Sequence, residues 1–202
     1  MKRLLNHPWF LWSILALPSI PMMLAASQGA DPERLLHPTG EFAARFMIIA
    51  MILSPLLRLF RQMNWKTGWI MWMLKRRRAF GVAAFGYAAI HTLFYVLDVR
   101  VLQDMLAEFW SLGVWTGWVA FAIFIPLALT SNQASVVALG SRWKTLQRWV
   151  YLAAVLTLIH WIFVHNNLGP ALVHFVPLAL LEIYRVVSIL NERKLKMEPL
   201  NS

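Results

Sequence analysis

The sequence contains no cysteine, and this absence removes several kinds of redox centre from consideration. Without a thiolate, a chain cannot ligate an iron–sulfur cluster, bind haem iron through sulfur, attach a c-type haem or form a disulfide. The sequence also lacks a glycine-rich βαβ unit of the kind that holds FAD or NAD(P)H. If the protein carries electrons, they must therefore come from a separate reductase or from quinol.

Acidic residues are also scarce, with 9 Asp and Glu against 19 Lys and Arg and a formal net charge of +10. The basic residues cluster beside apolar segments, as in the cytoplasmic loops of membrane proteins, and form no groove that could read nucleic acid. Hydrophobic residues make up 59% of the chain, and the mean hydropathy is +0.58. The composition therefore predicts an integral membrane protein whose partners include lipid and exclude nucleic acid.

The apolar segments predict an all-α fold, an integral membrane bundle of six transmembrane helices in one domain, 1–202. The predicted spans are about 9–26, 42–59, 79–97, 112–130, 149–164 and 171–190. The basic loop 60–78 contains no acid, whereas 98–111 is acidic overall and 27–41 is mixed, so both termini are expected in the cytoplasm. Residues 1–30 also fit a cleavable signal peptide, and retention as a span is the preferred interpretation.

Two of the predicted spans each contain a histidine at the same depth. His91 lies 12 residues after Ala79, and His160 lies 12 residues after Arg148. At 1.5 Å per residue, both imidazoles lie about 18 Å from the cytoplasmic face. A titratable group at that depth should be paired, face the bundle interior or hold a ligand.

Small residues accompany both histidines on the same helix face. Ala84 precedes His91 by seven residues and Ala153 precedes His160 by seven, almost two full turns. A flat macrocycle could lie against such faces, so the pattern favours a b-type haem whose iron is bound by His91 and His160. The alternative is that the two histidines are hydrogen-bonded packing residues.

Basic residues near the predicted span ends form a second group of candidates. Arg45 lies one turn inside the outer edge of its span, where it could contact a haem propionate or simply extend its charge toward water. Arg77, Arg78 and Arg148 lie at the cytoplasmic face, where they could contact an anionic flavin such as FMN or a quinone head group. Their alternative role is to set the membrane topology.

An ordered set of short motifs resembles the MsrQ (formerly YedZ) family of the ferric-reductase-like transmembrane superfamily. The motifs are Thr39-Gly40, Ser54-Pro-Leu-Leu-Arg58, Arg76-Arg-Arg-Ala-Phe-Gly81, Leu129-Thr-Ser-Asn-Gln133, Leu139-Gly-Ser-Arg-Trp143 and the span from Tyr151 to His160. The resemblance implies a multi-pass b-type cytochrome of the bacterial inner membrane. Such a protein takes electrons from a cytoplasmic flavin reductase or the quinol pool. It passes them to a periplasmic molybdopterin subunit, MsrP, which repairs oxidised methionine.

The resemblance also assigns residues. It places the haem-ligand histidines at His91 and His160, whereas a further family histidine, 13 residues before the second, is Gln147 here. Glutamine is a poor iron ligand, so one haem b is expected. In this interpretation the chain is an electron-transfer subunit without catalytic residues of its own for sulfoxide reduction.

Two other functions remain open from the sequence. One is a stand-alone quinol or ferric/metal-ion reductase of the same superfamily, which would pass electrons to a soluble acceptor. The other is a non-redox transporter or membrane assembly factor whose histidines bind a transition metal or only pack. A haem absorption band in the purified protein distinguishes the redox functions from the last one.

Overall fold

The computed structural model describes residues 7–165 and 167–197, and all regular secondary structure in these ranges is helical. The helices are α2 (Pro8–Ala16), α3 (Ser19–Ser27), α4 (Pro32–Gln62), α5 (Gly68–Leu74), α6 (Arg77–Val99), α7 (Leu102–Glu108), α8 (Leu112–Leu129), α9 (Gln133–Leu139), α10 (Ser141–Gln147), α11 (Val150–His165) and α12 (Leu168–Met197). Among the described residues, five helices are long and apolar enough to cross a membrane, or six if the bent pair α2 and α3 forms one span. The all-α class is confirmed, and the span count is five or six.

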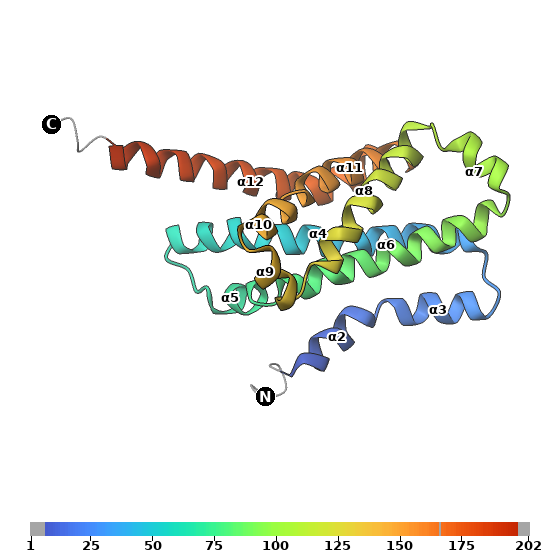
Figure 1. Cartoon of the computed structure of the whole chain (residues 1–202), viewed down its shortest axis with the longest axis horizontal. Coiled ribbons are helices and arrows are strands. Elements are labelled where there is room, and N and C mark those ends of the chain that lie inside the picture. The colour runs from blue at the N-terminus through green and yellow to red at the C-terminus, as the bar shows by residue number, and fades with distance from the viewer. Residues whose placement is uncertain (1–6, 166, 198–202) are drawn as a thin grey trace.

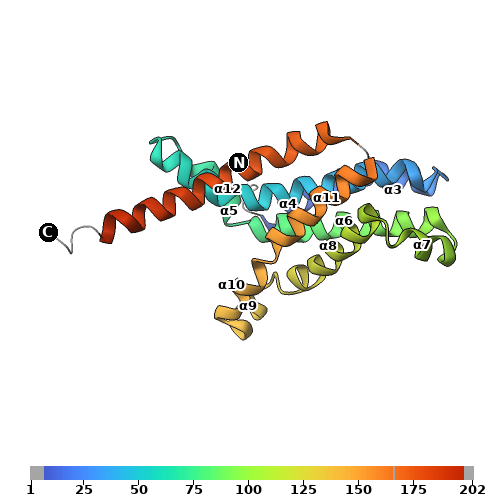
Figure 2. The same cartoon turned by 90° about the horizontal axis from the view of Figure 1, so that it is seen from above.

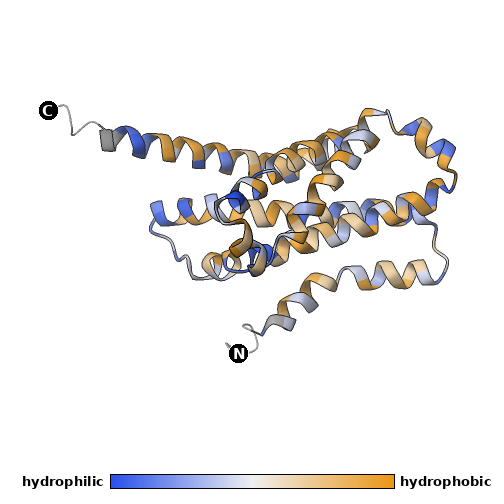
Figure 3. Ribbon diagram, viewed as in Figure 1, coloured by the Kyte–Doolittle hydropathy of each residue, from blue (hydrophilic) through white to orange (hydrophobic). Residues whose placement is uncertain are grey.

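The long helices form one bundle, with polar residues gathered toward its ends (Figure 1, Figure 3). Helix α4 packs most extensively against α6, α8 packs against α11, and α12 lies along α4 (Figure 2). We call the end where α4, α8 and α12 begin the outer end, following the charge-based topology, and the opposite end the inner end. The two helices that carry the candidate histidines, α6 and α11, both run toward the outer end.

Buried alanines let these helices approach closely. Ala44, Ala84 and Ala153 are 1%, 1% and 0% exposed, and Ala171 on α12 is also 0% exposed. In a membrane, where lipid is as apolar as the helix surfaces, helix association depends on close packing of small residues rather than on hydrophobic burial. The alanines therefore allow close contacts between neighbouring helices, in which α6 packs against α4 and α11 packs against α8.

The second span differs from its predicted range. We expected a loop at 27–41 and a span over 42–59, but α4 already begins at Pro32 and ends at Gln62. The Asp31 carboxylate accepts a hydrogen bond from the Glu33 amide, and Pro32 occupies the first turn. Asp before Pro and Glu is a helix-start signal, which the mixed charge of this stretch obscured. This correction adds more than two turns to the outer end of the bundle.

The N-terminal helices α2 and α3 are bent by 52° relative to each other. Pro18 lies at the break and has no N–H to continue the α2 hydrogen-bond ladder. The buried Tyr87 hydroxyl on α6 donates to the Leu15 carbonyl at a distance of 3.0 Å. Leu11, Leu15 and Met22 are buried in the main core. This segment is therefore packed into the bundle and joined to α6.

Tyr87→Phe should weaken this connection. It removes one buried hydrogen bond, worth about 1 kcal/mol, and keeps the ring packing. We expect a lower melting temperature in detergent and faster proteolysis between residues 16 and 19. Thr92→Val is the control, because the Thr92 hydroxyl bonds only to the Ala88 carbonyl within the same helix. Equal proteolysis of both variants would contradict a role for Tyr87 in holding the segment.

Candidate functional site

The structure brings the two predicted histidines into contact. The ring centroids of His91 on α6 and His160 on α11 lie 5.9 Å apart, and the ring planes are nearly perpendicular at 86°. A metal ion bound about 2 Å from one nitrogen of each imidazole would hold the ring centroids about 6 Å apart. The spacing therefore suits one metal ion between the two rings.

Each imidazole is anchored to a backbone carbonyl through its Nδ1 atom. His91 Nδ1 lies 2.9 Å from the Leu36 carbonyl oxygen and 3.3 Å from the Thr39 hydroxyl. His160 Nδ1 lies 2.8 Å from the Gly113 carbonyl oxygen. A carbonyl at Nδ1 selects the tautomer that carries its proton there, so the Nε2 lone pair is left to bind a metal. Both anchors come from the outer turns of the partner helices α4 and α8.

Two glycines leave room for the imidazoles. A Cβ atom added at Gly40 on α4 would lie 3.0 Å from His91 Nδ1 and Cε1, and one at Gly117 on α8 would lie 2.5 Å from His160 Nδ1. Neither gap tolerates a side chain without moving the ring. Sequence reasoning quoted Gly40 only as part of a motif and missed Gly117, because the contact depends on which helices meet.

Gly117→Ala should lower stability, contrary to the usual effect of this substitution in a helix. Alanine normally stabilises a helix by up to about 1 kcal/mol relative to glycine. At Gly117 the displaced imidazole should reverse the sign, at a cost of about 1–3 kcal/mol for overpacking. Gly86→Ala on α6 is the matched control, because a Cβ there meets no atom within 4 Å. A melting temperature for Gly117→Ala equal to or above that of Gly86→Ala would contradict the close packing.

Arg45 lies on α4 five residues past Gly40, and its recorded contacts are with other polar side chains and not with the histidine pair. Its Nη2 donates to Glu41 Oε1 at 2.5 Å, and its Nε donates to His174 Nε2 at 3.2 Å. In the same cluster, His37 Nδ1 lies 3.4 Å from His165 Nε2. The structure therefore places Arg45 in a network of polar side chains at the outer end, next to the histidine pair but not in contact with it.

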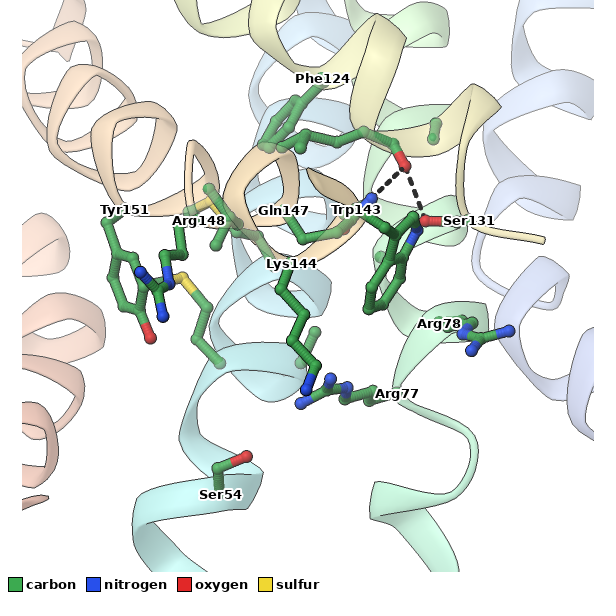
Figure 4. A pocket seen from close by; sticks show the side chains of 18 of the residues that line it. Ser54, Arg77, Arg78, Phe124, Ser131, Trp143, Lys144, Gln147, Arg148 and Tyr151 are labelled. Atoms are coloured by element: carbon green, nitrogen blue, oxygen red, sulfur yellow. Dashed lines mark hydrogen bonds between the residues drawn. The ribbon is translucent and has the colours of Figure 1, made fainter. Parts of the chain in front are cut away.

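A cavity of about 300 Å³ lies at the inner end, between α4, α6, α8, α10, α11 and α12 (Figure 4). It brings together the three cations proposed as ligand contacts at this face and two further cations. The five are Arg77, Arg78, Lys144, Arg148 and Arg185, and no acidic residue is among the described residues that line the cavity. The wall thus has a strong excess of positive charge, which favours an anionic ligand.

Two of the five cations already have partners. The Arg78 guanidinium lies 5.2 Å from the ring centroid of Trp143 and donates to Gln133 Oε1 at 3.3 Å. Arg185 Nη2 lies 2.6 Å from Glu182 Oε2. Arg185 Nη2 also donates to the Tyr151 hydroxyl on α11 at 2.7 Å, so both arginines join neighbouring segments.

The other three, Arg77, Lys144 and Arg148, form no side-chain hydrogen bond or ion pair with the part of the chain that the structure describes. All three are exposed, so water solvates them in the absence of a ligand. Their charges are therefore the ones free to bind an anion in this cavity.

Gln147, at the position of the missing family histidine, also lines the cavity. Its Nε2 donates to the Leu127 carbonyl and to the Thr130 hydroxyl, both at 3.1 Å. The amide therefore ties α10 to the inner end of α8. Ala84 lines the same cavity and Ala153 is fully buried, so the two alanines serve helix packing as much as any ligand.

Comparison with known proteins gives the family. Residues 39–158 match the family described as "Ferric reductase like transmembrane component". The chain is 36% identical over 168 residues to a protein-methionine-sulfoxide reductase heme-binding subunit MsrQ of Azospira oryzae, covering 80% of this chain and 69% of the relative. It is 35% identical to the MsrQ of an Enterobacter species, covering 81% and 82% of the two chains. The chain belongs to the MsrQ family.

The segment that matches the ferric-reductase-like family, residues 39–158, contains Gly40, His91 and Gly117, and His160 follows two residues later. A third MsrQ relative, from Cronobacter sakazakii, is 32% identical over 166 residues and covers 76% of this chain and 77% of its own. No solved structure matches the chain. The membership agrees with the resemblance drawn from the sequence motifs.

Proposed function

We propose that this MsrQ-family chain binds one haem b through His91 and His160 and relays electrons across the bacterial inner membrane. The acceptor is a periplasmic molybdopterin methionine sulfoxide reductase of the MsrP type, which repairs oxidised methionine. The observation that carries the proposal is the facing pair of imidazoles, each anchored at Nδ1 and 5.9 Å from the other. The relatives named as heme-binding subunits support it.

The residues present fit a haem better than a bare metal ion. In the described ranges, no group of three or more His, Cys, Asp or Glu residues is placed to hold a metal ion. Two imidazoles alone give a low coordination number, and a porphyrin would supply the remaining equatorial donors. Two axial histidines with no cysteine in the chain are the ligand set of a b-type cytochrome.

The protein's part in the relay is to hold and orient the two axial ligands. The Leu36 and Gly113 carbonyls, by accepting the Nδ1 protons, raise the basicity of the opposite nitrogens. Gly40 and Gly117 allow each helix partner to approach its imidazole. A bound haem would supply reversible one-electron chemistry. In this proposal the chain is an electron-transfer subunit of a larger reductase system, and its partner reduces the sulfoxide.

Electrons enter from the inner end in this proposal. The cation-lined cavity lies there, and Arg77, Arg148 and Lys144 are free to hold the phosphate of FMN or the polar head of a quinone. The donor is then a cytoplasmic flavin reductase or the quinol pool. The Arg78 guanidinium, which lies over the Trp143 ring, adds a further positive charge to the cavity wall. The basic inner loops favour a cytoplasmic location for this end and for both termini.

Arg45 contributes at the outer end. Its guanidinium is paired with the Glu41 carboxylate. A haem propionate would have to compete with that carboxylate. We therefore propose Arg45 as a secondary contact that affects the potential of the haem more than its retention.

The histidine substitutions test the central proposal. His91→Ala and His160→Ala should each abolish the low-spin b-type spectrum, because one axial ligand is lost. His174→Ala is the control, since its ring contacts Arg45 and Trp161 but not the histidine pair. Pyridine haemochrome quantitation of the purified chain should give about one haem per polypeptide, consistent with one bis-histidine site. Unchanged spectra in both alanine variants would refute the ligand assignment.

Substitutions in the cavity test the entry route. Arg77→Gln combined with Arg148→Gln should slow reduction of the haem by a flavin reductase or quinol by about tenfold or more, because two uncompensated charges are lost. Reduction by dithionite and the oxidised spectrum should not change. Arg142→Gln is the control, because Arg142 is an exposed cation on α10 that does not line the cavity. Equal reduction rates for all variants would place electron entry elsewhere.

A further inference from the structure

Trp161 directly follows the candidate ligand His160 on α11, and its side chain is almost completely buried. The residue is 5% exposed, and its Nε1 atom has no hydrogen-bond partner among the residues that the structure describes. A buried tryptophan N–H usually finds an acceptor, because a donor that is removed from water and left unpaired costs free energy. An acceptor for this N–H is therefore expected beside His160.

Two other buried side-chain atoms in the described ranges lack a hydrogen-bond partner, and each has a charged neighbour. Glu182 Oε1 belongs to a carboxylate whose other oxygen lies 2.6 Å from Arg185 Nη2. The Tyr95 hydroxyl interacts electrostatically with the Glu108 carboxylate. The Trp161 indole differs from both, because it packs against aromatic rings.

The rings around the indole hold it in place, but their polar atoms are already engaged. The indole centroid lies 5.1 Å from that of the His174 ring and 6.3 Å from that of the Phe175 ring. His174 Nδ1 lies 2.7 Å from a backbone carbonyl of its own helix, and its Nε2 accepts a hydrogen bond from Arg45. The nearby His165 ring directs its Nε2 to His37. The acceptor for the indole N–H is therefore expected from a group other than these neighbours.

A bound haem would bring an acceptor to this level of the bundle. Haem b carries two propionate carboxylates, and an N–H beside a carboxylate forms a charge-assisted hydrogen bond. Arg45, which donates to His174, adds a guanidinium to the same region. The cations of the inner cavity are more distant, since Arg148 precedes His160 by 12 residues, about 18 Å at 1.5 Å per residue. A propionate therefore suits the unpaired N–H of Trp161.

We infer that Trp161 Nε1 donates a hydrogen bond to one propionate of the haem that His91 and His160 bind. This inference rests on the proposed function, since it names a further contact of the proposed haem. Two axial imidazoles fix the iron, but they leave the porphyrin free to turn about the line that joins them. A hydrogen bond at the edge of the porphyrin stops this rotation, so Trp161 sets the orientation of the cofactor.

Trp161→Phe tests this contact, because it keeps an aromatic ring and removes the N–H. The variant should retain the low-spin spectrum, since both axial ligands remain, but the propionate bending band in its resonance Raman spectrum should move to lower frequency. Transfer of haem to excess apomyoglobin should be about tenfold faster, because one charge-assisted hydrogen bond is lost. Trp143→Phe is the matched control, since Trp143 is also buried but its Nε1 donates to the Thr130 carbonyl at 2.9 Å.

A porphyrin without carboxylates separates the hydrogen bond from packing. The purified chain is loaded either with haem b or with etiohaem, in which alkyl groups replace both propionates. Trp161→Phe should speed the loss of haem b and leave the rate of etiohaem loss within about twofold. Equal effects on both porphyrins would mean that the indole acts by packing or through a water molecule. No effect on either would mean that it makes no contact with the propionates. Each of these two results overturns the inference.

A second variant keeps the test valid if Trp161→Phe cannot hold haem at all. Benzothienylalanine at position 161 has nearly the shape of tryptophan but carries sulfur in place of the N–H, so it should lose haem b and retain etiohaem as described for phenylalanine. The unsubstituted chain distinguishes the two possible failures. If it binds no low-spin haem, the proposed function is wrong and the inference falls with it. If it binds one and both variants at position 161 behave like it, only the inference is wrong.

Discussion

The hydrogen bond between each imidazole Nδ1 and a backbone carbonyl of a neighbouring helix is the interaction on which the rest of the site depends. It fixes the ring orientation and reserves Nε2, but it forms only if α4 lies close to α6 and α8 lies close to α11. That closeness requires glycine at 40 and 117 and alanine elsewhere along the same contacts. The four helices therefore act as two pairs, each of which presents one ligand.

The outer and inner ends of the bundle differ in the charge of the side chains that surround the two helix pairs. At the outer end, the histidine pair lies near a network of Glu41, Arg45 and His174 in which the charges are matched. At the inner end, the cavity has excess positive charge and three cations that pair with no residue described in the structure. In the proposed relay, an electron would move from the cation-lined cavity at the inner end toward the polar network at the outer end.

The sequence was informative where a physical rule links residue type to depth. Basic clusters, apolar length and the equal spacing of His91 and His160 predicted the helical class and the meeting of the two rings, because these depend on distance along one helix. The sequence did not reveal Gly117, the place of Arg185 in the cavity wall or the contacts of Gln147, because these depend on which helix faces which. It also misplaced the start of α4, where Asp31 and Pro32 were evaluated for charge and not as a helix cap.

The bend between α2 and α3 has a consequence for the order in which the chain enters the membrane. The Leu15 carbonyl at that bend is bonded by Tyr87, 72 residues later in the sequence. A broken helix in lipid needs a neighbour to satisfy its freed backbone groups. During synthesis, the N-terminal segment emerges well before α6 and lacks this donor until α6 has been inserted. The segment that contains α2 and α3 therefore completes its packing only after a later helix arrives, so it depends on α6 for its final position.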